Sequence, residues 1–174
     1  MQALSFWKLI TMDEAQLLER LIALLTDHNI RYCVIGGQGV NAYVTPLVSL
    51  DLDLVIAVEQ LTAVESLLGQ EFTVRHFPHS INISLPNSEL RVQIQTDERY
   101  FDFVGRASVQ EVLGLSLPVA HVADLLQGKI GAFQDADQRA SKRQKDLTDI
   151  ARLLEEYPEL VAQVPDEIRQ RLIL

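Results

Sequence analysis

Apolar residues recur along the chain with two spacings, which predicts an alternation of helices and strands. Over residues 12–28 they return every three to four positions, as on the buried face of a helix, and Thr11 is placed to cap its start. The same spacing predicts helices over residues 60–68, 121–133 and 137–156. Short, β-branched or alternating runs predict strands at residues 32–35, 48–56, 72–75, 81–85 and 90–94. Turn residues separate the last three strands, which indicates an antiparallel extension.

The predicted strand at residues 48–56 carries two carboxylates, Asp51 and Asp53. Side chains at positions i and i+2 of a strand point to the same face, so these carboxylates converge while the intervening leucines face the opposite layer. Two like charges side by side are costly unless a cation or a base neutralises them. Carboxylate oxygens suit Mg²⁺, so we predict a metal site at Asp51 and Asp53.

The strand at residues 32–35 ends in a diglycine, Gly36-Gly37. Glycine permits a tight turn and a close approach of the backbone to a ligand. Residues 38–44 predict a short helix, whose free N–H groups would point at whatever lies above the turn. A diglycine turn followed by a helix therefore predicts a phosphate site.

This order of strand, diglycine, helix and Asp-x-Asp strand resembles the nucleotidyltransferase superfamily, which has the polymerase-β-like fold. The resemblance implies an α+β (α/β) chain with a small mixed central sheet, flanking helices and a C-terminal helical segment. A Walker loop would require Gly-Lys-Ser/Thr, which the sequence lacks. We predict a core at residues 1–115 and a helical region at residues 116–174 that packs on it as one compact unit.

The predicted helix at residues 137–156 has an apolar stripe on its C-terminal half. At about 100° per residue, that stripe extends back over Arg139, Arg143 and Asp146. These groups either aim toward the body of the protein, where they must be paired or functional, or belong to solvated first turns. Lys145 and Asp149 lie nearer the edge, where a surface pair is expected.

Residues 143–149 fit an R-x-K-D-x-x-D pattern that is similar to the C-terminal motif of the AbiEii-type nucleotidyltransferases. Residues 125–129 also resemble the lysine-bearing helix of that family, which includes toxins of toxin–antitoxin pairs. The resemblance implies that Asp51 and Asp53 bind metal and that Asp146 is a catalytic acid. The nucleotide-binding set that follows comprises Gly36, Gly37, Gln38, Lys129, Arg143 and Lys145.

Three positions depart from the family pattern. Gln38 follows the diglycine, where Ser or Thr is frequent, and Gln134 replaces an arginine, with Arg139 as a substitute. Gln93 occupies the place of the third carboxylate of the superfamily, and an amide cannot act as a base. Either Asp146 supplies the third acid, or catalysis is weak or absent.

The resemblance implies transfer of a nucleoside monophosphate from a nucleoside triphosphate to RNA, a protein or a small molecule, with one or two Mg²⁺ ions and release of pyrophosphate. A toxin of this type would have an antitoxin protein as a partner. Two alternatives remain: an inactive module that binds a nucleotide or a protein, and an antibiotic-modifying nucleotidyltransferase. An antibiotic-modifying enzyme would have a pocket with acidic walls near Asp53, because the substrates of such enzymes are often cationic.

Composition narrows the class of protein further. The net charge of −9 argues against a protein that binds nucleic acid through a general basic surface. No apolar run has the length of a membrane span, and the first residues lack the order of a signal peptide. The single cysteine, Cys33, lies in a predicted strand and is expected in the core. We therefore predict a cytoplasmic protein without a membrane partner.

Overall fold

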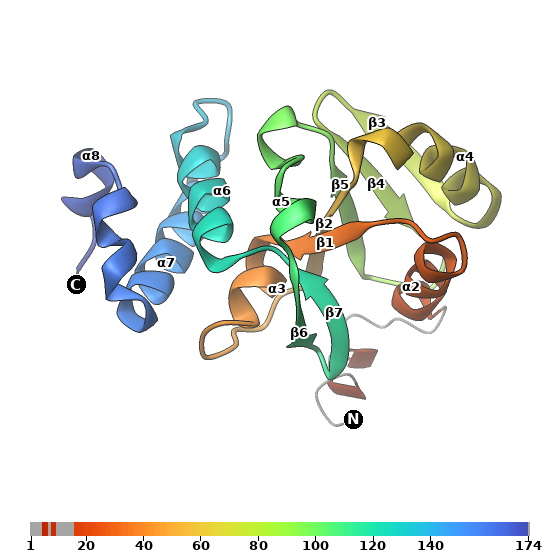
Figure 1. Cartoon of the computed structure of the whole chain (residues 1–174), viewed down its shortest axis with the longest axis horizontal. Coiled ribbons are helices and arrows are strands. Elements are labelled where there is room, and N and C mark those ends of the chain that lie inside the picture. The colour runs from red at the N-terminus through yellow and green to blue at the C-terminus, as the bar shows by residue number, and fades with distance from the viewer. Residues whose placement is uncertain (1–4, 7, 10–15, 174) are drawn as a thin grey trace.

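The computed structural model describes residues 5, 6, 8, 9 and 16–173. With the labels of Figure 1, the helices within residues 16–173 are α2 (Leu17–Asp27), α3 (Gly36–Asn41), η1 (Val58–Gln60), α4 (Leu61–Glu71), η2 (Glu98–Tyr100), α5 (Phe103–Arg106), α6 (Val122–Gln134), α7 (Ala140–Glu156), η3 (Pro158–Gln163) and α8 (Asp166–Arg169). The start of the predicted helix at residues 12–28, with its cap Thr11, lies outside the described residues. The other predicted helices are confirmed as α3, α4, α6 and α7.

The strands form one seven-stranded sheet in the order β3-β4-β5-β2-β1-β7-β6. Their bounds are β1 (Tyr32–Ile35), β2 (Asp51–Ile56), β3 (Thr73–Phe77), β4 (Ser80–Ser84), β5 (Arg91–Gln95), β6 (Ser108–Val112) and β7 (Leu115–Val119). β1 runs antiparallel to β2 and parallel to β7, while β2 runs parallel to β5. The sheet is therefore mixed, and the predicted fold class is confirmed.

The sequence analysis did not predict the hairpin of β6 and β7. Its strands are antiparallel to each other, and Val34 of β1 pairs with Val119 of β7. β7 contains Pro118, which lowers its strand propensity, and the exposed Val109 weakens the alternation in β6. Because pairing with the distant β1 holds this hairpin, no local pattern shows it. β7 starts at Leu115 and belongs to the sheet, so the sheet continues past residue 115. The division into a core at residues 1–115 and a helical region at residues 116–174 stays a prediction.

Alternation along β2 separates the core from the polar face of the sheet. Leu52 and Leu54 are fully buried, whereas Asp51 and Asp53 are only partly buried. Figure 1 shows α2 and α4 at one end of the sheet and α6, α7 and α8 at the other, with α3 between the sheet and that helical group. Cys33 is buried in β1, as expected.

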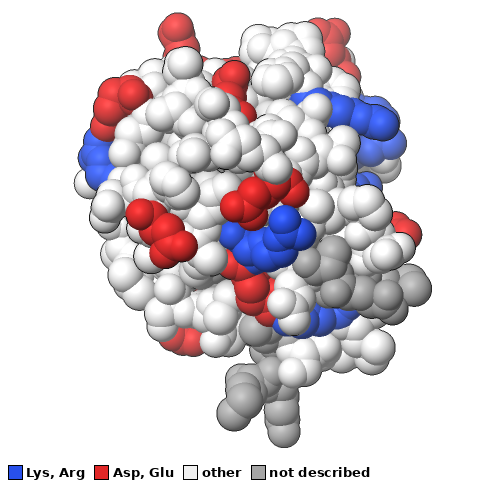
Figure 2. Space-filling view, turned by 90° about the vertical axis from the view of Figure 1, so that its right-hand side faces the viewer, with Lys and Arg blue, Asp and Glu red and all other residues white. Residues whose placement is uncertain are grey.

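The end of the molecule at which α2 and α4 lie has charges of both signs. Figure 2 shows them in small, separated groups, with no broad field of Lys and Arg on this side. Within residues 5, 6, 8, 9 and 16–173, no helix is both long and apolar enough to cross a membrane.

Candidate active site

A cleft of about 710 Å³ lies between the polar face of the sheet and the helices α6 and α7. Two parts of the chain that are far apart in sequence line it. The sheet side provides Gly36, Asp53, Gln93 and Gln95, and the helical side provides Lys129, Lys142 and Asp146.

Gly36 and Asp53 are in close contact at the floor of this cleft. The antiparallel register of β1 and β2 sets Ile35 opposite Asp53, so the next residue, Gly36, begins α3 beside the carboxylate. Gly36 has a φ of +65°, and a Cβ atom on it would overlap Oδ2 of Asp53. Glycine is therefore required twice here, for the left-handed backbone and for the space that the carboxylate fills.

The second glycine of the turn lies close to α7. A Cβ atom on Gly37 would be 3.6 Å from Oγ of Ser49 and 4.0 Å from Nζ of Lys145. The structure thus places the side chain of Lys145 next to the diglycine turn, although the lysine itself is exposed. An exposed ammonium group beside a glycine turn suits an anionic ligand.

The charge of Asp53 is held in a mixed electrostatic environment. Burial raises the pKa of Asp53. The charges of Lys129, Lys142 and Lys145 act to lower this pKa, and the charge of Asp51 raises it further. The effect of burial is larger than that of the lysines, so the pKa remains above its usual value. A cation at this carboxylate would offset the cost of its ionisation.

Asp51 has a basic partner on the neighbouring strand. The parallel register sets Asp51 beside Arg91, and Nε of Arg91 lies 2.8 Å from Oδ1 of Asp51. Both side chains are open to solvent, at 39% for Asp51 and 69% for Arg91. A pair this exposed contributes little to stability, so Asp51 can exchange Arg91 for another cation.

Gln93 lies beside Asp53, in the position where the resemblance expects a third carboxylate. The register pairs Asp53 of β2 with Gln93 of β5, and Gln93 lines the cleft. Gln93 is half-buried and shares the cleft with Asp53. The amide can donate and accept hydrogen bonds at this position, but it adds no negative charge.

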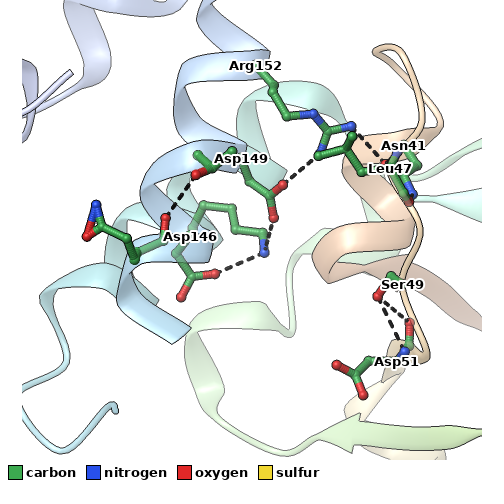
Figure 3. Close-up of polar contacts among 10 residues, drawn as sticks. Asn41, Leu47, Ser49, Asp51, Asp146, Asp149 and Arg152 are labelled. Carbon is green, nitrogen blue, oxygen red and sulfur yellow. Dashed lines mark hydrogen bonds and ion pairs between the residues drawn. The ribbon is translucent and has the colours of Figure 1, made fainter. Parts of the chain in front are cut away.

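A buried network of charges joins α6 to α7. Nζ of Lys129 lies 3.0 Å from Oδ1 of Asp146 and 2.7 Å from Oδ2 of Asp149, and Arg152 pairs with Asp149 at 2.7 Å (Figure 3). Burial lowers the pKa of Lys129, but the charges of Asp149 and Asp146 outweigh this effect, so the pKa is raised and the lysine stays charged. Oδ2 of Asp146 is buried without a hydrogen-bond partner among the described residues.

The expected surface pair of Lys145 with Asp149 is wrong. Asp149 is only 2% exposed and binds Lys129 and Arg152 instead. The reason is that α6 packs along α7 and covers the edge of the apolar stripe. The position of Asp149 in the sequence motif is the signal that could have identified it.

Six predicted residues are not among those that line the cleft. Asp51 lies beside Arg91, and Gly37 and Lys145 lie next to each other at the diglycine turn. The other three make contacts elsewhere. Gln38 is buried on the other side of α3, where its amide donates to the carbonyl oxygen of Ser49 at 3.1 Å. Nε of Arg143 donates to the carbonyl oxygen of Phe133 at 2.9 Å, so Arg143 satisfies a free carbonyl at the end of α6. Arg139 is exposed at the start of α7, which agrees with the solvated alternative for that turn.

Two glycines of α6 shape one wall of the cleft. A Cβ atom on Gly128 would be 3.2 Å from the ring of Tyr100, and one on Gly131 would be 3.0 Å from Nη1 of Arg99. These side chains can therefore pack directly on the helix. Arg99 also pairs with Asp97 at 2.8 Å. The sequence analysis missed this wall, for which the helical spacing of the two glycines is the available signal.

The two carboxylates of β2 fit the magnesium ion that the resemblance implies. Among the described residues, no cluster of three or more His, Cys, Asp or Glu side chains could hold a metal on its own. Mg²⁺ requires less, because it is usually held by one or two carboxylates together with phosphate oxygens. Asp51 and Asp53 on one face of β2 provide such a donor set, and the lysines nearby can hold the phosphates.

Comparisons with known proteins agree on the architecture. No family model and no curated protein matches the chain. Among solved structures, ANT(2'')-Ia in complex with adenylyl-2''-tobramycin has a TM-score of 0.64 at 13% identity, over 89% of this chain and 96% of that one. The lincomycin-bound lincosamide adenylyltransferase LnuA has a TM-score of 0.52 at 12% identity, over 80% and 97% of the chains. An antigenic nucleotidyltransferase-like protein from Paracoccidioides brasiliensis has a TM-score of 0.55 at 16% identity, over 92% and 90%.

The chain has the nucleotidyltransferase fold. At these identities the likeness shows the fold alone. The predicted superfamily fold is confirmed, whereas the AbiEii-type branch stays a prediction.

The contact between Gly36 and Asp53 can be tested by Gly36→Ala. The left-handed backbone alone costs an alanine about 1–2 kcal/mol, and the overlap with Asp53 adds to this cost, so the free energy of unfolding should fall by at least that amount. Chemical denaturation measures it. The control is Gly69→Ala in α4, where a Cβ atom meets nothing within 4 Å and the helix should gain about 0.5–1 kcal/mol. Equal effects of the two substitutions would contradict the close contact.

The environment of Asp53 predicts a pH-dependent effect of Asp53→Asn. Because burial raises the pKa of Asp53 in the folded state, its ionisation destabilises the fold as the pH rises through that pKa. Without metal, the variant should exceed the wild type in free energy of unfolding at neutral pH, and the difference should vanish toward about pH 4, the ordinary pKa of Asp. Denaturation at a series of pH values tests this. The prediction fails if Asp53→Asn lowers the free energy of unfolding, relative to wild type, more at pH 7 than at pH 4. Asp27→Asn, at an exposed position, controls for the loss of one charge.

Proposed function

We propose that the protein is a magnesium-dependent nucleotidyltransferase. The observation that carries this proposal is the floor of the cleft, where Asp53 lies against Gly36 and three lysines from α6 and α7 surround it. A structural core gains nothing from a carboxylate pressed against a glycine turn, whereas a site for a metal-bound triphosphate requires both.

The chain's own residues divide the work of the reaction. Asp51 and Asp53 would hold Mg²⁺, which supplies neutralisation of phosphate charge when bound. Lys145 beside the diglycine turn and Lys142 in the cleft would bind phosphate oxygens, while Lys129 adds positive charge from the wall. Positioning and charge neutralisation supply most of the catalysis in such transfers.

Asp146 would receive the proton of the acceptor. Its Oδ1 atom is held by Lys129, and its buried Oδ2 atom has no hydrogen-bond partner in the described part of the chain. Because Asp146 lines the cleft, a small rotation of its carboxylate would let Oδ2 accept from an acceptor hydroxyl group. As that hydroxyl oxygen bonds to the α-phosphorus, the bond to the bridging oxygen breaks and pyrophosphate leaves. The proton passes to Asp146, which takes the place of the carboxylate that Gln93 lacks.

For the acceptor, we propose a small cationic molecule, as in an antibiotic-modifying nucleotidyltransferase. Among the described residues, five carboxylates line the cleft, against the three permanent cations Arg99, Lys129 and Lys142. Three of the carboxylates, Asp97, Asp135 and Asp137, belong to segments outside β2 and α7, away from the triphosphate-binding residues. The ligands named for ANT(2'')-Ia and LnuA are small molecules as well.

A second candidate is an inactive module that binds a nucleotide. The observation in its favour is Gln93, which stands beside Asp53 without the charge of a third acid. The toxin role and the antitoxin partner that the AbiEii-type resemblance implies stay predictions, as does the cytoplasmic location.

The first test is magnesium-dependent binding and turnover of nucleoside triphosphates. Calorimetry with a non-hydrolysable ATP or GTP analogue should show binding that depends on Mg²⁺ in the wild type and not in Asp53→Asn. Lys145→Met should weaken binding about 10-fold, a typical loss for one charge-assisted contact, whereas Arg143→Met should leave it unchanged because Arg143 is directed to α6. A wild type that binds no triphosphate would refute the proposal.

The second test concerns the acceptor. With ATP or GTP, Mg²⁺ and the cationic compound tobramycin, pyrophosphate release should exceed that with an uncharged sugar, and Asp146→Asn should abolish it. Charge reversal by Asp135→Lys should weaken the binding of the cationic compound but not that of the triphosphate, because Asp135 lines the cleft outside the triphosphate-binding part. Binding of triphosphate without pyrophosphate release, whatever acceptor is offered, would support the inactive module.

A further inference from the structure

Arg152 links three segments from a position outside the cleft. Its side chain is 13% exposed, and Nη1 lies 2.7 Å from Oδ1 of Asp149 in the preceding turn of α7. Nη2 donates to Oδ1 of Asn41 at 2.8 Å and to the carbonyl oxygen of Thr45 at 2.6 Å. Figure 3 shows the guanidinium group between Asp149 on one side and Asn41 on the other. One planar group thus joins α7, α3 and the loop that follows α3.

Asn41 extends the network along that loop, which covers residues 42–50. Its Nδ2 atom donates to the carbonyl oxygen of Leu47 at 2.7 Å, and its Oδ1 atom accepts from the N–H of Leu47 at 3.0 Å. Gln38 holds the carbonyl oxygen of Ser49 in the same way, and the N–H of Asp51 donates to Oγ of Ser49 at 3.3 Å. The loop that delivers Asp51 to β2 is therefore fixed from α3.

Burying the charges of this network costs more free energy than a purely structural contact between helices requires. It buries Lys129, Asp146, Asp149 and Arg152, each with a side chain no more than 13% exposed. Apolar side chains of similar volume usually stabilise such a position as well or better, because burial removes four charges from water. What the charged set provides instead is a fixed geometry between helices, since each partner accepts only a narrow range of positions.

We propose that Arg152 and Asp149 are positioning residues for triphosphate binding. They hold α7 at a fixed height above α3 and the loop, so that Lys145 reaches the Gly36-Gly37 turn. Asp149 at the same time orients Lys129, which it shares with Asp146. This proposal rests on the proposed function, because it assigns a cause to the placement of two lysines of that site.

The charge of Arg152 matters as well as its shape. Lys129 and Arg152 together balance Asp146 and Asp149. Loss of Arg152 leaves one excess negative charge beside the cleft and lets Asp149 act on Lys129 alone. Lysine at position 152 would restore the charge, but an ammonium group cannot reproduce the planar fork that binds Asp149, Asn41 and Thr45 together.

A double-mutant cycle on Arg152 and Lys145 tests the proposal. Inorganic triphosphate with Mg²⁺ is the probe, at one concentration of the ion for all four proteins, so that the contribution of the β2 carboxylates is the same in each. Arg152→Met and Lys145→Met should each weaken binding about 10-fold, and the double variant should lose little more than either, because Lys145 already misses the turn when Arg152 is absent. Losses that multiply to about 100-fold would show independent roles and overturn the proposal, as would unchanged binding by Arg152→Met.

Two further variants keep the result interpretable. Arg169→Met removes an exposed arginine that is paired with Asp166 at the same i,i+3 spacing, and it should leave binding unchanged. Arg152→Lys preserves the charge, and with it the fold if Arg152→Met fails to fold. It should still weaken binding by about threefold or more and still be coupled to Lys145→Met. Near-UV circular dichroism verifies the fold of each variant. If the wild type itself binds no triphosphate, the proposed function fails; if it binds and the cycle is multiplicative, only the positioning role fails.

Discussion

The contact between Gly36 and Asp53 is the constraint on which the rest of the site depends. It requires β1 and β2 to be antiparallel neighbours with Ile35 opposite Asp53, and it requires a residue without a side chain at the start of α3. Once these are set, α3 leaves the sheet beside the carboxylate, and α6 packs so closely on it that a Cβ atom on Gly39 would be 2.7 Å from Leu125. A local steric condition thus determines where the helical wall of the cleft lies.

The buried charges between α6 and α7 form the second organising element. Lys129 binds Asp146 and Asp149, and Arg152 carries the connection on to α3. Charges in the interior make the register of two helices specific, because a shift by one turn would leave at least one group unpaired. The same helices supply a wall of the cleft and its charged side chains, so the register of α6 against α7 sets the composition of the candidate site.

Local patterns in the sequence were sufficient for the central features. Alternation around Asp51 and Asp53 predicted one strand with converging carboxylates, and the diglycine predicted the turn before them. What failed depended on distant contacts. β7 is a strand because β1 accepts it, Asp149 is buried because α6 covers it, and Gln38 points away because a loop carbonyl attracts its amide. None of these partners can be read from the neighbouring residues.

The balance of charge within the site has a consequence for how the protein folds. Asp51 is paired with Arg91, Asp146 with Lys129 and Asp149 with Arg152, while the neutral Gln93 stands where another acid would need a counter-ion. Small metal-dependent domains stay unfolded until their ion arrives, because their ligands repel one another without it. Here the chain carries its own counter-ions for these three carboxylates, so the proposed cation and nucleotide would bind to a site that is already folded.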